Sequence, residues 1–141
     1  AISPNSRFVA CFIEDGWLVV YSNDFSKKVL EFDTKSKVAP QQLCWCGEDS
    51  IVMFWKQLGI LMVGPYGDWV KYTYQDHVLL VQEIDCLRIV SPEAVEILQR
   101  VPDCTDSICR IGSFSPAAML MDALEAFDSC DPKADEIIRA I

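Results

Sequence analysis

Short runs of apolar residues, broken by turn-forming residues, occupy the first hundred positions of the chain. Runs of four to eight residues bounded by Gly, Pro, Asp, Asn or Ser are typical of β-strands. The pattern predicts ten strands, at 7–12, 17–22, 28–32, 43–46, 51–55, 60–64, 69–74, 78–82, 86–90 and 94–98. The last of them, within AVEILQR, is also compatible with a helix. Asp15-Gly16 predicts a tight hairpin between the first two strands, closed by a type I′ turn with two positive φ angles.

The strands repeat along the chain. DGWLVVYS (15–22) aligns with LGILMVGP (58–65), and RFVACF (7–12) aligns with SIVMFW (50–55), both at an offset of 43 residues. Units of about 40–45 residues with four strands are typical of β-propeller blades. A third copy, IDCLRIVS (84–91), follows after about 26 residues and is short of strands. Ring closure, in which the last blade borrows a strand from the other end of the chain, would explain this shortage.

Residues 103–141 have a different, helical pattern. TDSICRIGS predicts a short helix that ends at Gly112, and Ser115-Pro116 supplies a cap and a first-turn proline for the next helix. Asp131-Pro132 repeats this start signal. Apolar residues share one face of the middle helix, namely Ala117, Leu120, Met121, Leu124 and Phe127, while Ile137, Ile138 and Ile141 supply the apolar side of the last. Two antiparallel helices with a tight connection are expected, as at the start of an α-solenoid.

The fold class predicted from these patterns is mainly β with a C-terminal α part. Residues 1–102 are expected to form the C-terminal blades of a WD40-like β-propeller, and residues 103–141 to begin an α-solenoid. A start without Met (AISPNSRF) and an end within an apolar helical pattern suggest a piece of a longer protein. A piece with about two blades leaves blade faces open, so we expect it to aggregate or fold poorly alone.

Composition and charge exclude several classes of function. The chain has 141 residues, 51% of them hydrophobic, and a formal net charge of −9 from 21 acidic and 12 basic groups. Such a balance argues against nucleic-acid binding and against docking on anionic lipid, because both require clustered Lys and Arg. No apolar run approaches the roughly 20 residues of a membrane-spanning helix, so direct membrane insertion is not expected. Residues 103–141 hold eight acids against three bases, which allows either a solvated helix face or a docking face for a basic partner.

The cysteines do not predict a disulfide scaffold or a metal site. Their number is seven, which is odd, and no CxxC pair occurs. Cys44 and Cys46 lack a second pair of ligands at zinc-finger spacing, and Cys104 and Cys109 have no nearby histidine. Free thiols packed as small apolar residues are therefore expected, with no metal and no cofactor.

Catalytic patterns are weak throughout. A Cys–His or Ser–His–Asp site has to use His77, which is the one histidine and precedes a predicted strand. The Gly64–Asp68 segment lacks the lysine and the helix of a phosphate-binding loop and predicts a turn between strands. Acid pairs such as Glu14-Asp15 and Glu48-Asp49 also fall in predicted turns. The four tryptophans favour blade packing over a ligand-stacking platform: Trp17, Trp45, Trp55 and Trp69.

Four segments carry a resemblance to a known family: MVGPYGDWVKY (62–72), LQRVPD (98–103), IGSFSPAAMLMDALEAFD (111–128) and KADEIIRAI (133–141). With the strands around them, these segments resemble the N-terminal domain of the vacuolar protein sorting-associated protein 16 family. The resemblance covers essentially the whole chain.

The resemblance implies an N-terminal β-propeller that passes into an α-solenoid, in a core subunit of the HOPS and CORVET tethers. It implies a non-catalytic scaffold in vesicle-mediated transport, cytoplasmic and peripheral on late endosomes and on the lysosome or vacuole. It also implies the other class C subunits as partners, including the Sec1/Munc18-like subunit through the downstream solenoid, with SNAREs contacted indirectly. Two alternatives stay open: a thiol-dependent hydrolase that uses His77 with a cysteine, and a propeller scaffold of an unrelated complex.

Overall fold

The computed structural model describes residues 1–141, except for the side chain of Asp103, and divides into two compact units, residues 1–100 and 101–141. The first unit consists of antiparallel strands and the second of helices, which confirms a mainly β chain with a C-terminal α part.

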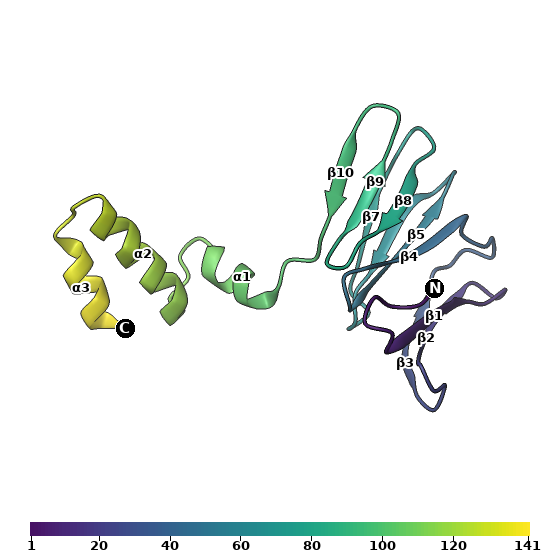
Figure 1. Ribbon diagram of the computed structural model, residues 1–141, viewed down its shortest axis with the longest axis horizontal. Coiled ribbons are helices and arrows are strands. Elements are labelled where there is room, and N and C mark those ends of the chain that lie inside the picture. Colours follow the sequence, from purple (N-terminus) through teal and green to yellow (C-terminus); the bar gives the residue numbers. More distant parts are fainter. The chain divides into compact units, whose positions relative to one another are not determined.

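Three antiparallel sheets make up the described part of the first unit (Figure 1). The first sheet holds β1 (Phe8–Phe12), β2 (Trp17–Ser22) and β3 (Lys28–Asp33). The middle sheet holds β4 (Gln42–Cys46), β5 (Ser50–Trp55), β6 (Gly59–Val63) and β7 (Trp69–Tyr72). The last sheet holds β8 (Leu79–Gln82), β9 (Leu87–Val90) and β10 (Val95–Leu98). All ten predicted strands are confirmed, and AVEIL forms a strand, not a helix; β7 ends at Tyr72, two residues earlier than predicted.

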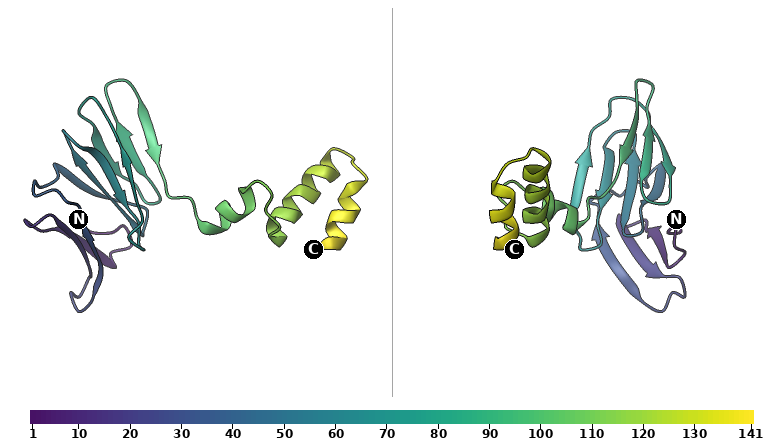
Figure 2. Two further views of the ribbon diagram at one scale, coloured as in Figure 1. Left: turned by 180° about the vertical axis from the view of Figure 1, so that it is seen from behind. Right: turned by 60° about the vertical axis from the view of Figure 1, so that its left-hand side comes forward.

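The sheets lie face to face, with the middle sheet covered on both sides (Figure 2). One cluster of apolar side chains joins the first and middle sheets, and it includes Leu18, Trp45 and Met53. A second cluster joins the middle and last sheets around Phe54 and Leu87. Because alternate residues of a strand point to opposite faces, every residue of β5 is buried.

The β1–β2 and β5–β6 turns each contain a left-handed glycine, at the predicted offset of 43 residues. Gly16 in the β1–β2 turn has φ +92°, and Gly59 in the β5–β6 turn has φ +85°. In both turns an amide donates back across the turn, from Gly16 to Ile13 O at 2.9 Å and from Leu58 to Trp55 O at 3.2 Å. The hairpin at Asp15-Gly16 is therefore confirmed, but the type I′ turn is wrong, because Gly16 alone has a positive φ there. A longer turn that ends in a left-handed glycine allows one non-glycine residue more in the loop.

Glutamine side chains connect edge strands of two sheets, β4 and β8. Gln42 on β4 donates from Nε2 to Val78 O at 2.7 Å and accepts from Leu80 N at 2.8 Å. Gln82 on β8 reciprocates, because its Oε1 accepts from Trp45 N at 3.0 Å. The two amide side chains satisfy backbone groups that no strand partner reaches, and they fix the middle and last sheets against each other.

The helical unit contains α1 (Asp103–Cys109), α2 (Pro116–Asp128) and α3 (Lys133–Ala140). Ser115 caps α2 as predicted, accepting from Ala118 N at 3.2 Å. Asp131 accepts from Lys133 N at 2.9 Å, close to its predicted capping place. The first helix, however, ends at Cys109, since Arg110 is already extended, and Gly112 follows with φ +74°.

The second and third helices pack side by side as the predicted antiparallel hairpin (Figure 1). The buried residues of these two helices are small: Ala118, Ala123 and Ala134. The apolar face predicted on α2 is not buried in this hairpin. Its large members are exposed: Leu120 is 60% and Phe127 69% exposed. No helix among the described residues combines the length and apolar character needed to cross a membrane.

Candidate binding groove

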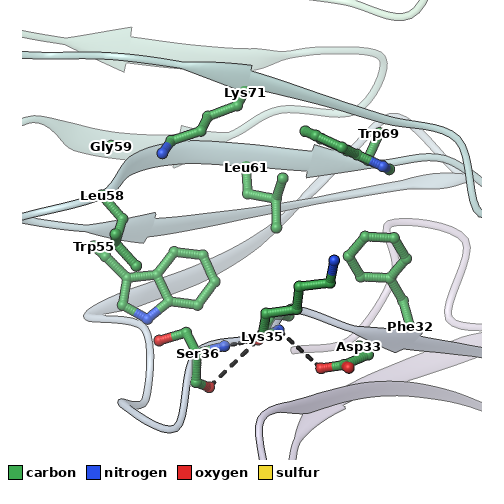
Figure 3. Close-up of a pocket in the computed structure, with 11 residues that line it drawn as sticks. Phe32, Asp33, Lys35, Ser36, Trp55, Leu58, Gly59, Leu61, Trp69 and Lys71 are labelled. Atoms are coloured by element: carbon green, nitrogen blue, oxygen red, sulfur yellow. Dashed lines mark hydrogen bonds between the residues drawn. The ribbon is translucent and has the colours of Figure 1, made fainter.

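A groove of about 470 Å³ opens between the first and middle sheets (Figure 3). It lies beside β3 and over the outer half of the middle sheet, formed by β6 and β7. The close-up shows an apolar wall from Trp55 through Leu61 to Trp69, with Phe32 opposite and the side chains of Lys35 and Lys71 beside it. The groove is therefore apolar inside and carries amines.

The loop after β3 is anchored at both of its ends. Thr34 donates from Oγ1 to Gly16 O at 2.6 Å, and Trp55 donates from Nε1 to Val38 O at 2.7 Å. Between these anchors Lys35 adopts φ +57°, with its amide donating to Asp33 Oδ1 at 2.8 Å. A left-handed conformation is uncommon for lysine and costs energy, so the surrounding hydrogen bonds hold Lys35 in place at the groove.

The β1–β2 and β5–β6 turns beside the groove require glycine where another backbone segment approaches closely. A Cβ on Gly16 would lie 2.6 Å from Ser36 O, and a Cβ on Gly59 would overlap Tyr72 O. Both glycines let a neighbouring backbone approach closely, in addition to their positive φ.

The sequence missed this groove because its parts are far apart in the chain. Lys35 lies after the predicted strand 28–32, and Lys71 lies within the predicted strand 69–74. The 43-residue repeat predicts that β3 and β7 hold equivalent places in neighbouring sheets, but it does not relate Lys35 to Lys71.

The tryptophans divide into two kinds. Trp45 and Trp55 are buried between sheets, at 2% and 5% exposure, as predicted for blade packing. Trp17 and Trp69 are 38% and 59% exposed. The prediction that all four pack in the core is therefore wrong for Trp17 and for Trp69, of which Trp69 presents its ring at the groove.

His77 lies apart from any arrangement for nucleophilic catalysis. Its ring is exposed and stacks on Phe54 with centroids 5.4 Å apart and an interplanar angle of 20°. No hydrogen bond joins His77 to a cysteine or a serine hydroxyl among the described residues.

The buried thiols are poor nucleophiles. Burial raises the pKa of Cys46 to about 11, and Cys46 donates to Leu98 O at 3.1 Å. Burial also raises the pKa of Cys44 and, together with a hydrogen bond to Glu83, that of Cys86. Because the thiolate is the reactive form, these three cysteines are in the state opposite to that of a catalytic thiol.

Glu83, Asp85 and Cys86 bring three ligand atoms within 4.8 Å of one another in the β8–β9 turn. Glu83 is already engaged, because its Oε1 lies 2.8 Å from Arg88 Nε. Two hard carboxylates and one protonated thiol are not the donor set of a structural zinc site. The sequence predicted zinc neither here nor at the other cysteines.

The predicted turn at Gly64–Asp68 is confirmed, with Gly64 N donating to Asp68 O at 2.7 Å. Arg100 connects it to the β4–β5 turn: its guanidinium lies 3.2 Å from Asp49 and 3.8 Å from Asp68, over the Tyr66 ring. The acids of these turns therefore make structural ion pairs.

Comparisons with known proteins point to one family. Residues 1–141 match the family described as "Vps16, N-terminal region". The chain is 45% identical over 140 residues to the protein VACUOLELESS1 of Arabidopsis thaliana, covering 99% of the chain and 16% of that relative.

Other relatives are named vacuolar protein sorting-associated protein 16 or homologs of it. A vacuolar protein sorting-associated protein 16 homolog of Dictyostelium discoideum is 41% identical over 144 residues, which is 99% of the chain and 17% of the relative. Vacuolar protein sorting-associated protein 16 of Saccharomyces cerevisiae is 32% identical over 141 residues, covering 98% and 17%. The chain spans about a sixth of the length of these curated relatives. By its full-length match, the chain belongs to the family of vacuolar protein sorting-associated protein 16, in the N-terminal region of that family.

Proposed function

We propose that this region belongs to a non-catalytic scaffold subunit of a membrane-tethering complex, HOPS or CORVET, that acts in vesicle-mediated protein transport. The observation that carries the proposal is the family match over residues 1–141. Three features support a role as a binding scaffold and not as an enzyme. The sheets are stacked, a buried thiol has a raised pKa, and the histidine stacks on an aromatic ring and makes no hydrogen bond to a cysteine among the described residues.

The three sheets are, in this proposal, consecutive blades of a β-propeller. Support comes from their face-to-face stacking, from the equivalence of β1–β3 with β5–β7, and from the matching left-handed glycines. The middle sheet has the four strands of a complete blade.

The helical hairpin of α2 and α3 is, likewise, the beginning of an α-solenoid. The exposed apolar face of α2, with Leu120, Leu124 and Phe127 more than half exposed, supports a further helical layer stacked on it.

The partners in this proposal are the other class C vacuolar protein sorting subunits, among them the Sec1/Munc18-like subunit, with SNAREs reached through them. Their contacts lie largely in the rest of the protein. The subunit would work in the cytoplasm, peripherally on late endosomes and on the lysosome or vacuole. Nucleic acid has no part in it, in keeping with a net charge of −9.

Co-purification tests this function. The full-length protein with an affinity tag is isolated from its own cells under native conditions, and its partners are identified by mass spectrometry. We expect the Sec1/Munc18-like subunit and the other class C subunits in near-equal amounts. Isolation of the protein with an unrelated set of subunits would instead favour the alternative, a propeller scaffold of an unrelated complex.

Thiol alkylation separates the scaffold from a thiol hydrolase. Iodoacetamide at pH 8 is expected to label the exposed Cys104, Cys109 and Cys130 first, and the buried Cys46 and Cys86 only after unfolding. A fast-labelling cysteine whose reactivity falls on substitution of His77→Ala would contradict the non-catalytic account.

A further inference from the structure

We propose that the groove between β3 and the β6–β7 half of the middle sheet binds a short linear peptide of a partner protein. The peptide carries carboxylates next to a bulky apolar side chain. This inference concerns the groove alone, and it holds whichever assembly the protein joins.

The groove exposes large apolar side chains in a concave setting. Its volume of about 470 Å³ lies within the range of about 300–1,000 Å³ that is typical of ligand sites. Trp69 is 59% and Leu58 44% exposed, while Leu61 forms the half-buried wall between them. An exposed tryptophan at a hollow is typical of the anchors that dominate binding energy at interfaces.

The charge of the groove selects the peptide. Lys35 and Lys71 both line it, and within the part of the chain that the structure describes neither amine pairs with a carboxylate. The one acid of the lining, Asp33, is engaged by the Lys35 amide. On a chain with a net charge of −9, this is a local basic site, and it is complementary to carboxylates.

The groove is also organised before any ligand arrives. Hydrogen bonds from Thr34 to Gly16 O and from Trp55 to Val38 O fix the loop that carries Lys35. A site whose parts are already ordered loses less entropy on binding. The left-handed φ of Lys35 is a cost that these contacts sustain, as is common at binding sites.

The neighbouring β7 favours an extended ligand. Among the described strands it pairs with β6 on one side only, so its other edge has unpaired backbone groups. A peptide strand can add to such an edge while alternate side chains enter an adjacent groove.

A missing strand of the first sheet is not the occupant. The bridge between Ile2 and Val9 extends that sheet beyond β1, on the side away from β3. The equivalence of β1–β3 with β5–β7 leaves the place of β4 empty beside β1, so a fourth strand of the first sheet is expected at that edge and leaves the groove open.

Selection from a random peptide library on the full-length protein tests the proposal. We expect enrichment of peptides with at least two acids beside Trp, Phe or Leu. We expect their affinity to fall at least about tenfold in the double variant Lys35→Glu/Lys71→Glu, and again with Trp69→Ala. Binding should also weaken as salt rises from 50 to 500 mM, because exposed ion pairs are screened.

The matched control is Lys27→Glu/Lys133→Glu, which changes the net charge equally at exposed lysines outside the groove. It should leave the selected peptides bound. Enrichment of no motif, enrichment of basic peptides, or acidic peptides that bind the groove variant unchanged would each overturn the proposal. So would binding of the groove to phosphatidylserine vesicles with no acidic peptide selected.

Discussion

At the scale of single residues, glycine and lysine conformations explain what the sequence pattern could not. The hairpin at Asp15-Gly16 was predictable from the residue types, but the turn type depends on hydrogen bonds between Gly16 and Ile13 that form only in the fold. Lys35 has a left-handed φ beside two hydrogen bonds: its own amide donates to Asp33 Oδ1, and the neighbouring Thr34 donates to Gly16 O, eighteen positions earlier in the chain. Local propensity therefore located the turns without defining their geometry.

Substitution of Gly59→Ala tests the close approach at the β5–β6 turn. Backbone strain of alanine at φ +85° costs about 1–3 kcal/mol. We expect the free energy of unfolding to fall by more than this strain alone, because the new Cβ would also overlap Tyr72 O. The control is Gly67→Ala, with a similar φ of +81° but no atom within 4 Å of the new Cβ. Urea-dependent pulse proteolysis of the full-length protein gives the difference, and an equal loss in both variants would contradict the account.

Alkaline pH should destabilise the first unit. Burial raises the pKa of Cys46 from 9.0 to about 11, and burial with the hydrogen bond to Glu96 raises that of Tyr74 from 10.0 to about 12. A folded-state pKa above the unfolded value gives stability that is complete below the unfolded pKa and lost above it. The urea midpoint should hold from pH 7 to 9 and fall between pH 9 and 12. Tyr74→Phe should flatten the fall above pH 10; a midpoint that rises with pH would be the contrary result.

At the scale of elements, the sequence predicted which strands and helices form better than it predicted how they pack. The ten strands and three helices match the predicted elements. The two-residue period of a strand and the 3.6-residue period of a helix are local properties of the chain, so the sequence shows them directly. The burial of α2 did not follow: the small Ala118 and Ala123 are buried, whereas Leu120 and Phe127 are exposed. An apolar stripe predicts a contact but not the partner that makes it.

Gln42 provides a direct test of how two sheets are joined. Gln42→Ala removes the bonds to Val78 O and Leu80 N and leaves both backbone groups short of a partner. We expect a loss of about 1–3 kcal/mol. Gln41→Ala is the matched control, because its exposed side chain makes no hydrogen bond within the described residues. Equal effects of the two substitutions on pulse proteolysis would rule out the amide clamp.

At the scale of the whole molecule, the last sheet of the first unit has an exposed apolar face. The outward face of the last sheet holds Leu79, Val81, Val95 and Ile97, with exposures of 40–65%. The 43-residue repeat in the sequence anticipated stacked sheets, because each unit buries only one face on its neighbour. The apolar alternation of β8 and β10 predicted such a face, but alternation alone does not identify what packs on it.

The isolated 141-residue chain should self-associate through these faces. We expect its apparent mass in light scattering to increase with concentration, because apolar faces and strand edges seek partners. Ile97→Glu should reduce the association, whereas Glu93→Gln, at an exposed turn position, should not. A monomeric chain with a cooperative thermal melt would contradict this expectation.

The most direct test of the central claim, that these sheets are blades of a closed propeller, is the solvent access of Ile97 in the full-length protein. In the present segment this side chain is 65% exposed. Ile97→Cys and Asp15→Cys are introduced separately, and maleimide labelling at each position is followed by peptide mapping. A covering blade predicts labelling at least about a hundredfold slower at position 97 than at the turn position 15, because modification then requires local opening. Equal labelling rates at the two positions would contradict the propeller.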